Sequence, residues 1–107
     1  MISQYKYNTM NVQIQSLKFN ADVKLLDFIQ KKMDKLDTFY ERIISGEVLL
    51  KLNNEGVKNK TVEIKLNIPG DQLFSIGRSR TFESASEEAI AALKSQLIKV
   101  KEKVIAR

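Results

Sequence analysis

Apolar residues recur at steps of three or four along the last quarter of the chain, which is the period of an α-helix. No Pro or Gly interrupts residues 82–107, and Thr81 stands where a side-chain oxygen can cap the first turn. The pattern therefore predicts one long amphipathic helix over this range. Its apolar stripe consists of Phe82, Ala85, Ala89, Leu93, Leu97, Val100 and Val104.

A second amphipathic helix is predicted for residues 21–42. Asn20 or Asp22 can cap its start, Tyr40 is expected to be a core residue near its end, and Ser45-Gly46 is expected to terminate it. Its apolar stripe runs through Val23, Leu26, Ile29, Met33, Leu36 and either Phe39 or Tyr40.

Four shorter segments alternate between apolar and polar residues, which is the period of a half-buried β-strand. Turn-forming residues at 53–56 and 69–71 separate the last three of them. In the last segment Phe74 and Ile76 share one face, and Gly77 is expected to mark a bulge or a bend. The four segments cover residues 10–14, 48–52, 62–68 and 73–80.

The order of these elements predicts an α+β two-layer sandwich with the topology β-α-β-β-β-α. Short turns favour an antiparallel meander for the last three strands, and the first strand must join the same sheet to cover its apolar residues. Both helices are expected to pack on one face of this four-stranded sheet, because each has one apolar side to bury. We expect a single domain over residues 10–107. Residues 1–9 are expected to be a flexible extension: a native segment, the result of a misassigned start, or an expression remnant.

Composition argues against an enzyme. The chain of 107 residues contains no Cys and no His, so it lacks the commonest general base and the commonest metal ligands. Neither a glycine-rich phosphate loop nor a G-x-S-x-G motif is present. We therefore expect no catalytic residues, no metal, no cofactor and no small-molecule substrate. No apolar run is long enough to cross a membrane, and the absence of Cys fits a cytoplasmic protein.

Positive charge is the main functional signal. The net charge is +5 and the isoelectric point is near 9.5, which favours an anionic partner. If the helices lie side by side, Lys32 and Lys35 face the lysines of the last helix, and together they suit the phosphates of a folded RNA. Arg78 and Arg80 are added because they share a strand face at its end. An acidic protein partner stays open, whereas a membrane surface is disfavoured. The lysines of the last helix are Lys94, Lys99, Lys101 and Lys103.

Three segments resemble the ribosome hibernation-promoting factor family, also called the sigma-54 modulation or ribosome-associated inhibitor family. MNVQIQSLKF at residues 10–19 is similar to the family's first strand. LLDFIQKKMDKLDTFYERI at 25–43 is similar to its first helix. TFESASEEAIAALKSQLIKVKEKV at 81–104 resembles its last helix, whose Q-L-x-K-x-K-x-K run is present here from Gln96 to Lys103.

The resemblance implies a fold like that of double-stranded RNA-binding domains, and a function that composition could not show. Members of the family bind the small ribosomal subunit in the channel used by tRNA and mRNA, contact 16S rRNA, block translation and preserve idle ribosomes. By position, the resemblance implies rRNA contacts from both helices. These residues are Lys32, Lys35, Arg42, Lys99 and Lys103, with Lys94 and Lys101 as additions.

The chain ends after its last helix, so it resembles the short members of the family. A short member that pairs ribosomes should need a helper protein, whereas one that acts alone silences single ribosomes. Two alternatives stay open. One is a general binder of structured RNA on the same platform, and the other is a protein-interaction domain that uses its sheet face.

Overall fold

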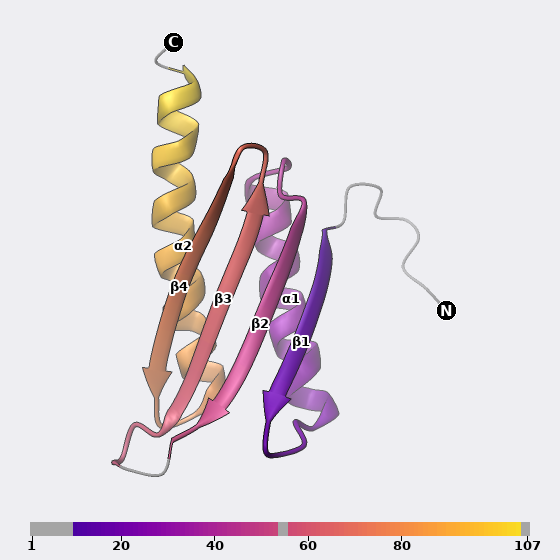
Figure 1. Ribbon diagram of the computed structural model, residues 1–107, viewed down its shortest axis with the longest axis vertical. Coiled ribbons are helices and arrows are strands. Elements are labelled where there is room, and N and C mark those ends of the chain that lie inside the picture. The colour runs from indigo at the N-terminus through magenta and orange to yellow at the C-terminus, as the bar shows by residue number, and fades with distance from the viewer. Residues whose placement is uncertain (1–9, 54–55, 106–107) are drawn as a thin grey trace.

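The computed structural model describes residues 10–53 and 56–105, and its elements follow the predicted order (Figure 1). The sheet has the order β1-β2-β3-β4, with β1 parallel to β2 and the other neighbours antiparallel. This confirms the α+β fold, the antiparallel meander and the place of the first strand in the sheet. The strands are β1 (Asn11–Leu17), β2 (Ser45–Leu52), β3 (Lys60–Ile68) and β4 (Asp71–Ser79), and the helices are α1 (Val23–Phe39) and α2 (Phe82–Ile105).

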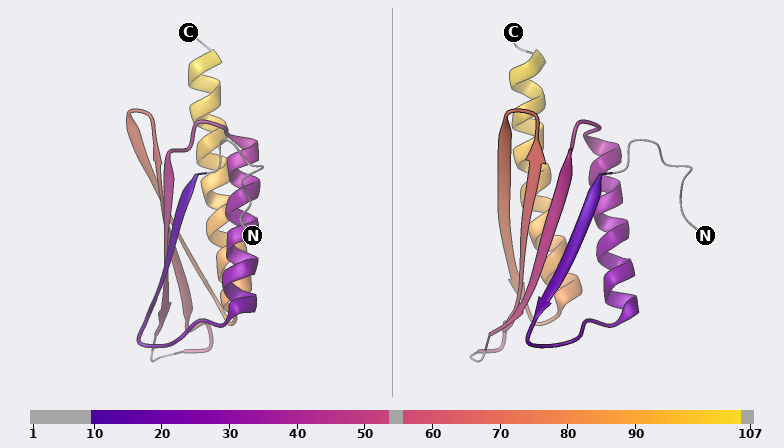
Figure 2. Two further views of the ribbon diagram at one scale, coloured as in Figure 1. Left: turned by 90° about the vertical axis from the view of Figure 1, so that its right-hand side faces the viewer. Right: turned by 45° about the vertical axis from the view of Figure 1, so that its right-hand side comes forward.

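Both helices cover the same face of the sheet, as predicted, and leave the other face open (Figure 2). The alternation along β3 explains this layering, because every second side chain of that strand is apolar and buried under the helices. Ile29 and Met33 of α1 and Leu93 and Leu97 of α2 meet that face and are fully buried. The core is therefore a single layer between one sheet face and two helices.

Helix α1 is shorter than predicted at both ends. Asp22 is its cap, with the carboxylate accepting a hydrogen bond from the Leu25 N–H at 2.9 Å. The helix ends at Phe39 instead of residue 42, because Tyr40 adopts an extended conformation (φ −137°, ψ 103°). The connection after it turns Tyr40 and Ile43 into the core, where both are buried. The prediction of Tyr40 as a core residue is thus confirmed.

Two other expectations for this region were wrong. Val23 is 70% exposed, and Leu25 takes the buried position in the first turn instead. Ser45 and Gly46 do not terminate the helix but open β2, where Gly46 lies on the core side. A Cβ atom on Gly46 would lie 2.7 Å from the terminal methyl group of Met33, so this glycine makes room for a core side chain.

The face of β4 that meets α2 carries small residues instead of large apolar ones. Gly77 pairs with Val62 in an uninterrupted register, so β4 has no bulge at this glycine. A Cβ atom on Gly77 would overlap the Ala85 carbonyl oxygen and lie 2.9 Å from the Ala89 nitrogen. Ser75 donates a hydrogen bond from its hydroxyl to the Ala89 carbonyl at 2.8 Å. The backbone of α2 therefore lies directly against β4.

Phe74 and Ile76 do share a face, as predicted, but it is the open face of the sheet, where they are 48% and 44% exposed. Thr81 caps α2 by accepting a hydrogen bond from the Ser84 N–H at 3.0 Å, and the last turns of the helix extend past the strands (Figure 1).

The turn at 69–71 is confirmed, with Gly70 at φ +78°. Two residues of the predicted turn at 53–56 lie outside the described residues. No helix in the described part of the chain combines the length and the apolarity needed to cross a membrane.

Gly77→Ala is expected to lower the free energy of unfolding by about 3 kcal/mol, the upper end of the usual range for overpacking, because the new methyl group meets helix backbone. Gly46→Ala is the matched control. Its methyl group meets only side-chain ends, those of Met33, Leu66 and Met10, and no backbone, so the expected loss is about 1 kcal/mol. Urea unfolding of both variants measures the difference, and equal losses would contradict the close contact between α2 and β4.

Candidate nucleic-acid interface

A groove between α1 and α2 brings together lysines from both helices. The helices run in the same direction side by side, and α1 contacts α2 along its length (Figures 1 and 2). The groove contains a half-open hollow of about 150 Å³ with an apolar floor and a basic rim. We call this the interhelical groove. It is lined by Lys32, Lys35, Leu36, Phe39, Ile90 and Lys94.

Aromatic rings of α1 hold several of these ammonium groups in place. The Lys32 Nζ atom lies 5.3 Å from the centre of the Phe28 ring. The Nζ atoms of Lys94 and Lys101 lie 5.0 Å and 4.4 Å from the centre of the Phe39 ring. A cation over an aromatic face is attracted by the ring quadrupole, which favours these positions over freely moving side chains.

Phe28 and Phe39 contact lysines of both helices, and their spacing along α1 explains this. They are eleven residues apart, which is about three helical turns, so they lie on the same side of α1. Lys101 is held further by a hydrogen bond from its Nζ atom to the Phe39 carbonyl oxygen at 3.3 Å, at the end of α1 where free carbonyl groups favour a cation. The sequence analysis did not predict a place in the interface for either phenylalanine. Their spacing with Lys32, one turn after Phe28, is a signal that could have found them.

One acidic side chain borders this basic cluster. The Glu87 carboxylate lies 3.4 Å from the Lys32 Nζ atom, and their side chains are 56% and 29% exposed. Such an exposed pair contributes little to folding. It does compete directly with any phosphate that approaches Lys32.

The other two lysines of α2 lie on the opposite flank of that helix. Glu88 accepts a hydrogen bond from a backbone N–H of β4 at 3.0 Å, and Gln96 donates one to a β4 carbonyl at 2.9 Å, so this flank borders the outer edge of β4. Lys99 follows Glu88 by about three turns, and Lys103 follows Gln96 by about two turns. Both lysines therefore lie on the β4 flank, where they are exposed.

The expectation of one continuous lysine surface is thus only partly met. Lys32, Lys35 and Lys94 meet in the groove, with Lys101 beside them over Phe39. Lys99 and Lys103 project from the other side of α2 and are therefore separate from this cluster. The last residues of α2 also extend past the sheet, so a large partner can reach both of its flanks there (Figure 1).

The three arginines of the predicted site lie elsewhere. Arg42 is exposed in the connection after α1, at the end of the molecule from which α2 extends (Figure 1). Arg78 points from β4 to the open sheet face, away from the helices. Arg80 lies beyond the end of β4, so the two do not share a strand face, and it borders a hollow together with Lys60 and Phe82.

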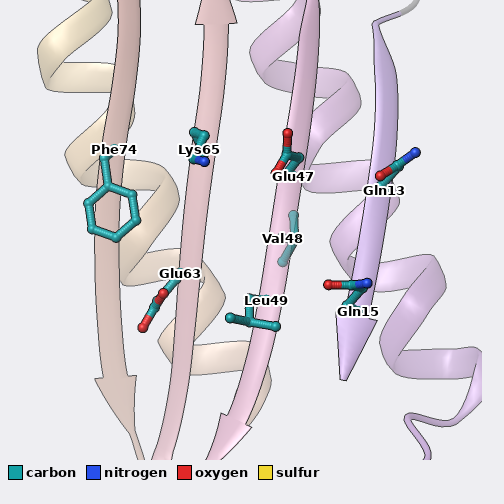
Figure 3. A pocket seen from close by; sticks show the side chains of 8 residues that line it. All are labelled: Gln13, Gln15, Glu47, Val48, Leu49, Glu63, Lys65 and Phe74. Carbon is teal, nitrogen blue, oxygen red and sulfur yellow. The ribbon is translucent and has the colours of Figure 1, made fainter. Parts of the chain in front are cut away.

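The open sheet face differs in character from the helical face. A hollow of about 330 Å³ lies across the middle of the strands. The side chains that line it include two acids, Glu47 and Glu63, and one base, Lys65 (Figure 3). The Glu63 carboxylate is also paired with the Lys51 Nζ atom at 2.6 Å. Phe74 borders the hollow. The middle of this face is mixed in charge and therefore suits a phosphate backbone less well than the helical face does.

These features define a small α+β domain with a basic groove between two helices and a mixed open sheet. Residues 12–105 match the family model described as Sigma 54 modulation protein / S30EA ribosomal protein. The chain therefore belongs to this family of ribosome-associated proteins, which confirms the resemblance found in the sequence.

Individual proteins are similar over most of their length. The ribosome hibernation promoting factor of Azotobacter vinelandii is 29% identical over 98 residues, which cover 92% of this chain and 89% of that protein. A ribosomal subunit interface protein from Coxiella burnetii superimposes with a TM-score of 0.79 at 19% identity, covering 87% of this chain and 99% of that one. The N-terminal domain of Thermus thermophilus Protein Y gives 0.74 at 20% identity, covering 85% and 99%. These two structures share the fold.

Glu87→Gln is expected to strengthen binding of a structured RNA, because it removes the carboxylate that competes for Lys32. Exposed ion pairs contribute at most about 1 kcal/mol, so the gain should reach no more than about fivefold. Glu102→Gln, on the same helix, changes the net charge equally and should give a smaller gain. Fluorescence anisotropy with a labelled RNA at fixed salt compares the two, and equal gains would show that only net charge matters.

Proposed function

We propose that this protein binds the small ribosomal subunit through 16S rRNA, in the channel used by tRNA and mRNA, and thereby blocks translation and preserves idle ribosomes. It acts in the cytoplasm as a non-enzymatic ribosome hibernation factor. Family membership and the similarity to a ribosome hibernation promoting factor support this proposal. The proposed RNA-binding residues are Lys32, Lys35, Arg42, Arg78, Arg80, Lys94, Lys99, Lys101 and Lys103.

The observation that carries the proposal is the set of lysines in and beside the interhelical groove. Phosphate groups are recognised by cations at spaced positions, and each phosphate neutralised releases counterions from the RNA. Lys32, Lys94 and Lys101 already have their ammonium groups placed over aromatic rings. Less side-chain entropy is then lost when a phosphate binds.

Co-sedimentation with small ribosomal subunits tests the function. The full chain should bind saturably, tRNA in excess should displace it, and the affinity should fall steeply as salt rises. Four lysines that each neutralise one phosphate give a slope of about −3.6 in log affinity against log salt. Absence of binding at low salt would reject the proposal and turn attention to the open sheet face. Equal affinity for unrelated structured RNAs would favour a general RNA binder instead.

Two charge-reversal pairs distinguish the flanks of α2. Lys32→Glu with Lys94→Glu changes the groove, and Lys99→Glu with Lys103→Glu changes the β4 flank by the same net charge. Both variants should bind subunits at least about tenfold more weakly, and the groove pair should lose more because its ammonium groups are held in place. Thermal unfolding serves as the control, since surface substitutions usually change stability by about half a kcal/mol or less. Full binding by the groove variant would contradict the assignment of the interhelical groove as the RNA-binding site.

A further inference from the structure

The floor of the interhelical groove is apolar, which binding to a phosphate backbone alone does not require. Leu36 at its base is 2% exposed, and Phe39 and Ile90 are half-buried and packed against the core. Lysines stand around these side chains at the rim. We propose that the groove receives one unstacked pyrimidine base of an RNA, with the rim lysines on the neighbouring phosphates. This inference rests on the proposed function and adds to it the kind of RNA feature that is recognised.

The combination of groups selects the class of ligand. Contacts to phosphates need cations and hydrogen-bond donors, and they need no concave apolar surface. A nucleotide base can pack its flat ring on the apolar floor, while the phosphates on either side of it contact the lysines of the rim. Proteins that read single-stranded or bulged RNA commonly hold splayed bases against aromatic side chains, with cations on the flanking backbone.

The size of the cavity selects the ring. A cavity of about 150 Å³ lined by Leu, Ile and Phe accepts a benzene molecule. The groove has a half-open hollow of similar volume, about 150 Å³, with these three residue types in its floor and lysines at its rim. A six-membered pyrimidine therefore fits, whereas the second ring of a purine would extend over the lysine rim.

The rim explains how the rest of the nucleotide is placed. Lys32 and Lys35 approach the cavity from α1 and Lys94 approaches it from α2, so cations stand on both sides of an inserted ring. The Phe39 ring forms part of the floor and also holds the Lys94 ammonium group at 5.0 Å. A continuous duplex cannot insert a base, because its bases remain stacked and paired. We therefore expect a preference for RNA with an extruded nucleotide.

The test uses the full chain and four labelled RNA hairpins that differ at one position. One has a continuous stem, and the others have a single bulged uridine, a single bulged adenosine or an abasic bulge. The uridine hairpin should bind about tenfold more tightly than the continuous and abasic hairpins, and the adenosine hairpin should fall between them. Equal affinity for the uridine and abasic hairpins would overturn the assignment. This comparison uses the unaltered protein, so no variant has to fold for it to be decisive.

A matched pair of variants localises the effect. Phe39→Leu should reduce the preference for the uridine bulge to less than about threefold, because it removes the ring from the floor. Phe74→Leu makes the same change on the open sheet face, away from the groove, so both the affinity and the preference should remain. Loss of the preference in both variants, or in neither, would place the base elsewhere.

The outcomes also separate this inference from the function on which it rests. If all hairpins bind equally and weaken together with salt, the RNA-binding function stands and the base site is wrong. If none binds at low salt, both are wrong. Tighter binding of an acidic peptide that contains tyrosine than of the uridine hairpin would likewise overturn the assignment, because the groove would then fit a protein partner.

Discussion

The contact between α2 and β4 determines how the rest of the structure is arranged. Gly77 and Ser75 leave space on the strand, and Ala85 and Ala89 leave space on the helix, so two backbones meet with almost no side chains between them. Such a contact sets the rotation of α2 about its own axis as well as its distance, because any rotation would drive a larger side chain into the strand. With that rotation, the side chains of Glu88 and Gln96 hydrogen-bond to the backbone of β4. The same rotation determines the side of the molecule to which each lysine of the helix projects.

The two helices contribute different parts of the candidate interface. Helix α2 supplies most of the cations, whereas α1 supplies the aromatic rings on which they rest. A lysine that is free in solution loses much rotamer entropy when it binds a phosphate, and the rings reduce that loss in advance. The buried floor of the groove belongs to the same hydrophobic core that holds the helices on the sheet. The stability of the domain and the shape of its candidate site therefore depend on the same side chains.

The sequence was sufficient for features that depend on local periodicity and insufficient for those that depend on rotation and distance. Alternation and helical spacing predicted the element order and the layering, and charge selected the lysines whose RNA-binding role stays a prediction. The end of α1 was placed too late because Tyr40 continues an apolar pattern while its backbone is already extended. The role of Gly77 could not be deduced, since it depends on a helix backbone that follows later in the chain. The separation of Lys99 from Lys94 could have been read from their spacing, because five residues turn an α-helix by about 140°. Which of the two lysines faces α1 depends on the contact between α2 and β4, which lies outside that local pattern.

Charge is also distributed unevenly along the length of α2. Its first turns carry Glu83, Glu87 and Glu88, whereas from Leu93 to Lys103 the helix has four lysines and one acid. These later turns lead out past the sheet (Figure 1). Helix α2 is therefore asymmetric in charge along its length, with a basic projecting end, and the field of an anionic partner would draw that end toward it before any contact forms. Such orientation acts on the rate of encounter more than on the lifetime of the complex, so the association rate should carry most of the sensitivity to salt.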